Sequence, residues 1–246
     1  MTLKKGCFNP SERFLRPIFP GSLEEKCLKE DDLLMSKKLY YEDGYQREFE
    51  AEIIEITEEG VVLNKTCFYP EGGGQVGDTG KLDEEEVEDT RTRDNRIIHI
   101  VNNKAKFEVG RNVRGTINWE RRYRIMNLHS AAHIVDYYFM IVFGEHERIG
   151  SNIDESKSRC DYAHEGRLDP VMLKEVEELS NKFIAKNHVI KTWSDQSNPS
   201  YRYWKCENIE MACGGIHVRN TKEIGSLRLK RKNIGKGKER IEILLD

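Results

Sequence analysis

The longest regular spacing of hydrophobic positions in the chain begins at Leu128. From there apolar residues recur at helical spacing, and neither proline nor glycine interrupts the run before Gly144. This spacing matches the period of an α-helix with one apolar face. We therefore predict an amphipathic helix whose apolar face is formed by Leu128, Ala131, Ala132, Val135, Phe139 and Val142.

Between residues 35 and 118 the hydrophobic positions alternate with polar ones, as in β-strands with one buried face. The turn Glu58-Glu59-Gly60 between the first two alternating runs predicts a hairpin. Short strands separated by polar turns are typical of small barrels, so we predict a β-barrel-like domain over residues 35–118. His99 should belong to its sheet and not to a functional site. The predicted strands cover residues 49–56, 61–69, 96–101 and 111–119.

Residues 119–246 predict a second domain, in which helices pack on an antiparallel sheet. A helix should begin at Asp169-Pro170, because Asp is a preferred N-cap and Pro suits the first helical position. The sequence predicts no regular structure over 194–212. The whole chain is therefore predicted to be α+β. Strands are expected within 189–193 and 216–245, and a strand pair or an irregular loop within 149–164.

Residues 1–34 show no sustained hydrophobic period, and several prolines interrupt them. We treat them as an N-terminal extension to which no role is assigned. The chain as a whole is polar, with 37% hydrophobic and 34% charged residues, and it has no apolar run near the ~20 residues that a membrane span needs. No signal-peptide pattern is visible, and six cysteines without a compact framework fit a reducing compartment. These features predict a cytoplasmic protein with no membrane partner and no evident obligate protein partner.

The net charge of −3 is unevenly distributed. Residues 1–118 hold 18 Lys/Arg against 24 Asp/Glu, whereas residues 219–240 hold nine basic residues against two acidic ones. Basic patches of this kind bind phosphates or form solvated surfaces. The candidate residues for phosphate contacts are Arg121, Arg122, Arg124, Lys230, Arg231 and Lys232.

Two short motifs carry the candidate chemistry. His129 and His133 are four residues apart on the predicted helix, so their imidazoles share one face. In C-G-G-I-H, Cys213 and His217 repeat that spacing, and the two glycines between them allow the backbone to fold closely around an ion. Histidine and cysteine are preferred zinc ligands, so the motifs together predict one zinc site. The glutamate of the metallopeptidase pattern H-E-x-x-H is missing, which disfavours a peptidase.

A third motif, P-E-G-G-G-Q-V-G-D-T-G, spans residues 70–80. It has no G-K-S/T ending, so it is not a phosphate-binding P-loop. So much glycine is typical of a loop that needs unusual backbone angles or lets a ligand approach closely. The motif is therefore either a plain structural turn or a ligand-binding loop, and Gln75 in its middle can both donate and accept hydrogen bonds.

Taken together, these motifs resemble alanyl-tRNA editing proteins of the AlaX type, in the medium-length class, which are related to the editing domain of alanyl-tRNA synthetase. The resemblance covers about residues 35–246 and leaves no room for an aminoacylation domain, so the family implies editing in trans. The motifs that carry the resemblance are F-Y-P-E-G-G-G-Q-V-G-D-T-G (68–80), H-S-A-A-H (129–133), G-S (150–151), C-D-Y (160–162), C-G-G-I-H-V (213–218) and T-K-E-I-G (221–225).

The resemblance implies zinc-dependent hydrolysis of the aminoacyl ester of mischarged Ser-tRNA(Ala), with Gly-tRNA(Ala) as a second substrate. The six candidate residues for phosphate contacts would then bind tRNA. Its zinc residues would be His129, His133, Cys213 and His217, of which the first three, with Gln75, are the catalytic candidates. His217 is the first that we would leave uncoordinated, because catalytic zinc usually keeps one open position.

Ser151 is the candidate hydroxyl that recognises serine, together with Gln75 as a substrate-binding residue. Asp161 would either orient a zinc-bound histidine or be a surface carboxylate. Two alternatives remain open at this point: a threonyl-tRNA-type editing domain, which shares the metal motifs, and a non-catalytic zinc-stabilised RNA-binding module.

Overall fold

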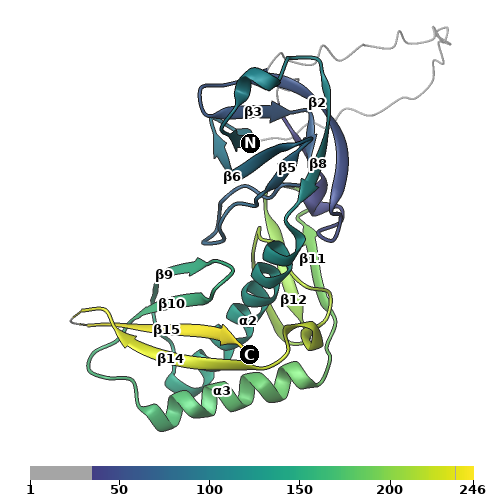
Figure 1. The fold of residues 1–246 in the computed structure, drawn as a ribbon. Coiled ribbons are helices and arrows are strands. Elements are labelled where there is room, and N and C mark those ends of the chain that lie inside the picture. The colour runs from purple at the N-terminus through teal and green to yellow at the C-terminus, as the bar shows by residue number, and fades with distance from the viewer. Residues whose placement is uncertain (1–34, 236) are drawn as a thin grey trace, which may run out of the picture. The chain divides into compact units, whose positions relative to one another are not determined.

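The computed structural model describes residues 35–235 and 237–246, so the predicted extension, residues 1–34, lies outside the described residues. Within the described part the chain is α+β, as predicted, with two long helices and mostly antiparallel strand pairs (Figure 1). The helices are α2 (Trp119–Phe143) and α3 (Pro170–Ala185), with short 3-10 turns η1 (Leu39–Tyr41), η2 (Lys104–Lys106) and η3 (Thr221–Ile224).

Six strands of the first part pair in a closed order, β2-β3-β7-β6-β5-β8. The predicted hairpin is confirmed, because β2 and β3 pair antiparallel with Ile56 opposite Val61. Apolar side chains of these strands form one buried cluster that includes Ile53, Leu63 and Leu82. The strands of this part are β1 (Lys37–Lys38), β2 (Glu48–Ile56), β3 (Gly60–Leu63), β4 (Lys65–Thr66), β5 (Gly80–Leu82), β6 (Glu85–Arg93), β7 (Arg96–Val101) and β8 (Asn112–Ile117).

His99 lies in β7 and is fully buried, which confirms that it belongs to the sheet. Its Nδ1 donates to the carbonyl of Val61 at 3.1 Å, and its Nε2 lies 2.8 Å from the hydroxyl of Thr66. A ring that donates through Nδ1 and accepts through Nε2 is the neutral form. Burial favours that form and lowers the pKa of His99 to about 4.

The second part has two antiparallel sheets, ordered β14-β15-β10-β9 and β11-β12-β13. The predicted strands near the C-terminus are confirmed, and residues 149–164 form the strand pair and not the irregular loop. The prediction for 194–212 was wrong, because two paired strands lie there. The strands are β9 (Arg148–Ile153), β10 (Ser158–Ala163), β11 (Ile190–Ser194), β12 (Arg202–Cys206), β13 (Ile209–Ala212), β14 (Leu227–Asn233) and β15 (Lys238–Leu245).

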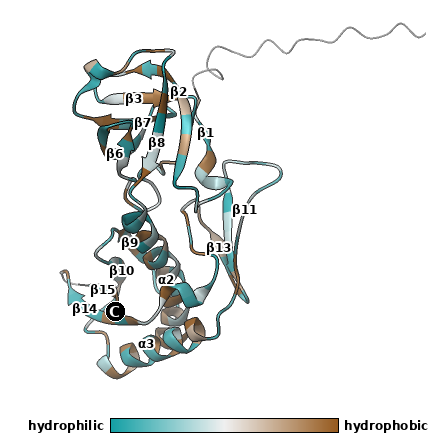
Figure 2. Cartoon of the chain, turned by 45° about the vertical axis from the view of Figure 1, so that its right-hand side comes forward, coloured by the Kyte–Doolittle hydropathy of each residue, from teal (hydrophilic) through white to brown (hydrophobic). Residues whose placement is uncertain are grey.

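The two helices bury different shares of their surface. α3 begins as predicted, with the Asp169 side chain accepting from the backbone N–H of Val171, and its apolar stripe packs on the core. The alternation of hydrophobic and polar residues along it can be followed in Figure 2. The middle of α2 is instead buried on every side from Ile125 to Val135, so the prediction of a single buried face was wrong. Its polar side chains His129, Ser130 and His133 are buried together with the apolar ones.

Within the described residues, neither helix combines the length and the apolar character that crossing a membrane would require.

Candidate metal centre

Helix α2 places two imidazoles side by side in the interior. His129 and His133 are 3% and 6% exposed, and their ring centroids are 4.9 Å apart. The helix begins nearly three turns earlier, at an N-cap in which the Asn118 side chain accepts from the backbone N–H of Arg121. The histidine pair therefore lies in the rigid middle of a long helix and not at a fraying end.

The other half of the site is the loop after β13, residues 213–217, which we call the cluster loop. It brings Cys213 and His217 against the helix, so that one ligand atom from each of the four predicted residues lies within 4.8 Å of every other. The Cys213 sulfur is 3.4 Å from Nε2 of His129 and 3.2 Å from Nε2 of His217. The structure thus assembles the set of three nitrogens and one sulfur that the sequence predicted, a set that suits zinc.

Two polar side chains turn the histidine nitrogens toward the cluster. Nδ1 of His129 donates to the side-chain carbonyl of Gln75 at 2.8 Å, which leaves its Nε2 with a free lone pair. The hydroxyl of Ser130 donates to the carbonyl of Met126 at 2.9 Å, so it accepts from Nδ1 of His217 at 3.1 Å. Both rings are therefore fixed as metal ligands usually are, by a hydrogen bond at the remote nitrogen.

The cluster is polar, buried and incompletely paired. Among the described residues, neither ring nitrogen of His133 has a hydrogen-bond partner, although both are buried. Burial lowers the pKa of His129 to about 3, lowers the pKa values of His133 and His217, and raises the pKa of the Cys213 thiol to about 11. Neutral imidazoles with free lone pairs suit a cation, and a bound metal is what deprotonates a buried thiol. The residues present therefore fit a zinc ion.

The cluster loop can approach α2 this closely because Gly215 has no side chain. A Cβ at this position would lie 2.1 Å from Cε1 of His129 and 3.0 Å from the side-chain oxygen of Gln75. At Gly214 the nearest atom to an added Cβ is the Tyr41 hydroxyl at 3.6 Å, an ordinary contact. One glycine of the pair is thus required by the site, and the other is not.

The glycine-rich motif delivers Gln75 to the cluster. Gly74 has a positive φ of 85°, and a Cβ there would lie 2.6 Å from the Ser151 hydroxyl. On either side of Gln75 the backbone bonds to β9, with Ile153 donating to Gly74 and Val76 donating to Ile153. Gln75 is 1% exposed, and its side-chain NH₂ group has no partner among the described residues.

Two sequence predictions need correction. Arg122 was predicted to bind tRNA, but it is fully buried, where it donates to Asp78 and to the carbonyl of Cys67. Asp161 was predicted to orient a ligand histidine or to be a surface carboxylate. It is buried in a two-bond ion pair with Arg240, at 2.7 and 2.9 Å. The Nδ1 atoms of His129 and His217 are paired instead with Gln75 and Ser130. Ser130 was missed, although it lies inside the H-S-A-A-H motif.

The other predicted residues lie outside the cluster. Ser151 lies in β9 against Gly74. Arg121, Arg231 and Lys232 form ion pairs with the carboxylates of Glu155, Glu239 and Glu242. Arg124 and Lys230 are exposed, and no ion pair joins either of them to another residue of the described part.

Comparison with known proteins adds to this geometry. The family model of class II (A) tRNA synthetases matches residues 22–121, and that of the second additional domain of threonyl and alanyl tRNA synthetases matches residues 205–242. The chain is 35% identical over 239 residues to an alanine–tRNA ligase of Methanococcus maripaludis (strain C6) and 34% identical over 225 residues to one of Saccharolobus islandicus (strain L.S.2.15). These matches cover 89% and 79% of this chain but only 27% and 25% of the ligases, so the chain spans about a quarter of their length.

A further relative is matched over nearly its whole length. The alanyl-tRNA editing protein AlaX-M of Pyrococcus horikoshii is 35% identical over 217 residues, which cover 86% of this chain and 99% of that protein. Together with the match to the second additional domain and the predicted resemblance, this similarity shows that the chain belongs to the AlaX-type family of alanyl-tRNA editing proteins.

Proposed function

We propose that this chain edits mischarged tRNA in trans, by zinc-dependent hydrolysis of the ester that joins serine to tRNA(Ala). The observation that carries the proposal is the convergence of four zinc-ligand side chains, His129, His133, Cys213 and His217, beside the unpartnered amide of Gln75. A zinc ion held there would supply Lewis-acid polarisation of the ester carbonyl and would acidify water. The family and the site support the same reaction class.

The roles of the protein's own residues follow from their contacts. His129, His133 and Cys213 would hold the ion, with His217 as the fourth candidate ligand. The Gln75 side chain points its carbonyl at His129 and keeps its NH₂ group for the substrate, so it would orient the ester or the attacking water. Cys213 acts as a ligand and not as a nucleophile, because burial disfavours its free thiolate.

Serine differs from alanine by one hydroxyl, and a pocket built to hydrogen-bond that group can reject the analogue lacking it by about 10⁴. We assign this recognition to Ser151, which lies against the loop that carries Gln75. Hydroxyl recognition does not select glycine, and we propose Gly-tRNA(Ala) as a second substrate because the family resemblance implies it. Ser151→Ala should lower the rate on Ser-tRNA(Ala) and leave the rate on Gly-tRNA(Ala) unchanged, which makes the glycyl ester the internal control.

We further propose two functional domains, a barrel-like domain over 35–118 that supplies the glycine-rich loop, and an editing domain over 119–246. The first span has a buried cluster of its own residues, which supports the division, whereas the cluster of the second span also takes in Tyr40, Tyr69 and Ile97. For tRNA we retain Arg124 and Lys230 as phosphate contacts, and Arg121, Arg231 and Lys232 as further candidates whose side chains are ion-paired in the free protein. Reversing the charge of Arg124 and Lys230 together should raise KM for tRNA and weaken its salt dependence.

The direct test measures deacylation of Ser-, Gly- and Ala-tRNA(Ala) side by side. We expect release of serine and glycine and sparing of alanine. If the protein binds tRNA without accelerating any release, the zinc-stabilised RNA-binding module is the correct function. Preference for a seryl ester on threonine tRNA over one on tRNA(Ala) would favour the threonyl-type domain.

A further inference from the structure

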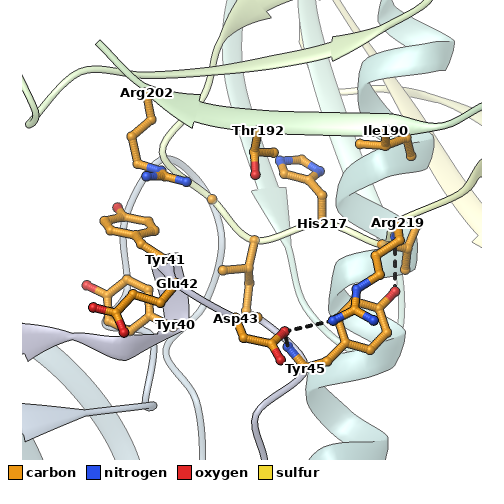
Figure 3. Close-up of a pocket in the computed structure, with 14 residues that line it drawn as sticks. Tyr40, Tyr41, Glu42, Asp43, Tyr45, Ile190, Thr192, Arg202, His217 and Arg219 are labelled. Carbon is orange, nitrogen blue, oxygen red and sulfur yellow. Dashed lines mark hydrogen bonds and ion pairs between the residues drawn. The ribbon is translucent and has the colours of Figure 1, made fainter. Parts of the chain in front are cut away.

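A cavity of about 380 Å³ lies next to the cluster loop (Figure 3). Residues 215–217 of the cluster loop line it together with Val218 and Arg219, and the other lining residues come from 40–45 and from strands β11 and β12. It adjoins the proposed reaction centre, because His217 belongs to both. The other residues that line the cavity have no role in the proposed reaction.

The charges along this cavity do not balance. Two acidic residues line it, and each has a cationic partner: Glu42 pairs with Lys37 at 2.9 Å, and Asp43 pairs with Arg219 at 3.0 Å. Arg202 also lines the cavity, but no ion pair joins it to any residue that the structure describes. The cavity therefore has one uncompensated positive charge.

Arg202 is held in place and is 8% exposed. Its guanidinium carbon lies 4.0 Å from the centre of the Tyr41 ring, one NH group donates to the Ser194 hydroxyl at 2.6 Å, and its buried Nε–H has no partner among the described residues. Tyr41 in turn donates to the carbonyl of Gly214 at 2.9 Å, which ties the arginine to the cluster loop. A buried guanidinium without a counter-charge is costly unless an anion completes it.

We propose that this cavity binds the last nucleotide of the tRNA, and that Arg202 contacts its phosphodiester. The inference rests on the proposed function, because the phosphodiester of the terminal nucleotide is the anion that accompanies the reacting ester into the site. Tyrosine and arginine side chains together are a usual lining for single-stranded nucleic acid. Arg202 is thus a binding residue that anchors the substrate beside the cluster, and it takes no part in the bond-breaking step.

The test compares 5′-AMP with adenosine, binding each to the zinc-loaded protein by calorimetry. A charge-assisted contact to phosphate should make AMP bind about ten- to a hundredfold more tightly than adenosine. Arg202→Gln should remove that difference, and Arg202→Lys should keep part of it. The double variant Asp43→Asn/Arg219→Gln is the matched control, because it removes an ion pair of the cavity without changing its net charge, and it should keep the difference.

Equal binding of AMP and adenosine by the unaltered protein would overturn the inference without any variant. So would a preference for AMP that survives in Arg202→Gln, since the phosphate would then be held elsewhere, for example by the metal. With Ser-tRNA(Ala), Arg202→Gln should raise KM about tenfold or more and change kcat little. If the protein prefers AMP to adenosine through Arg202 but shows no deacylase activity, only the proposed function is wrong. If the protein deacylates Ser-tRNA(Ala) and Arg202→Gln leaves KM unchanged, only this inference is wrong.

Discussion

The buried ion pair between Arg122 and Asp78 gives the sharpest prediction about the fold, because it joins helix α2 to the glycine-rich motif. Arg122 is fully buried, and it also donates to the carbonyls of Gly44 and Gln46, each at 3.4 Å. In Arg122→Met these acceptors and the Asp78 carboxylate stay buried without their donor. Removing one partner of a buried pair typically costs about 3 to 5 kcal/mol, a large part of the roughly 5 to 15 kcal/mol that stabilises a folded protein.

Urea denaturation of Arg122→Met, Asp78→Asn and the double variant measures this directly. The double variant should lose about 1 to 3 kcal/mol less than the sum of the two single losses, because it leaves no lone charge behind. Arg114→Met, which breaks an exposed pair with Glu48, is the control and should leave the denaturation midpoint almost unchanged. If Arg122→Met behaves like Arg114→Met, the burial and pairing of Arg122 are not as described.

Three further predictions concern single positions. Gly215→Ala should abolish zinc retention on dialysis, because its Cβ would overlap an imidazole of the cluster, whereas Gly214→Ala should retain the metal; equal retention would contradict the packing. Gly74→Ala should lower kcat more than Gly73→Ala: both have positive φ, but an added Cβ meets no atom within 4 Å at Gly73. Equal losses would show that backbone strain alone matters. Lowering the pH from 6.5 to 4 should lower the free energy of unfolding by about 3 kcal/mol through His99. Over this range the histidine binds a proton in the unfolded chain, whereas in the folded protein its pKa of about 4 keeps it largely neutral until the pH reaches 4. His99→Gln should lose that part of the pH dependence, and an unchanged slope would refute it.

The metal cluster could be predicted from sequence because its halves are local. Helical spacing sets the His129–His133 distance, and two glycines mark the tight loop between Cys213 and His217. The reach of Gln75 into the cluster depends on the packing of the glycine-rich loop against β9, and only the family resemblance indicated it. The direction of Ser130 toward His217 could be read only from the folded chain.

The errors have physical causes of their own. Strand β6 (Glu85–Arg93) was not predicted because it is largely charged and buries little more than Val87 and Thr90. Over 194–212, polar residues before Arg202 obscured two short strands that alternate around Trp204. Arg122 reads as a surface residue because charge alone does not reveal a partner 44 positions away. Long-range pairing decides such cases, and spacing along the chain does not report it.

Zinc removal and restoration test the central claim most directly. Protein as purified, after chelation, and after return of zinc should be compared for zinc content and for the rate of serine release from Ser-tRNA(Ala), with Cys213→Ala alongside. We expect about one zinc per chain, loss of the rate when the metal is removed, recovery of the rate when zinc returns, and no activity in Cys213→Ala. A full rate in zinc-free protein would contradict the proposed role of zinc.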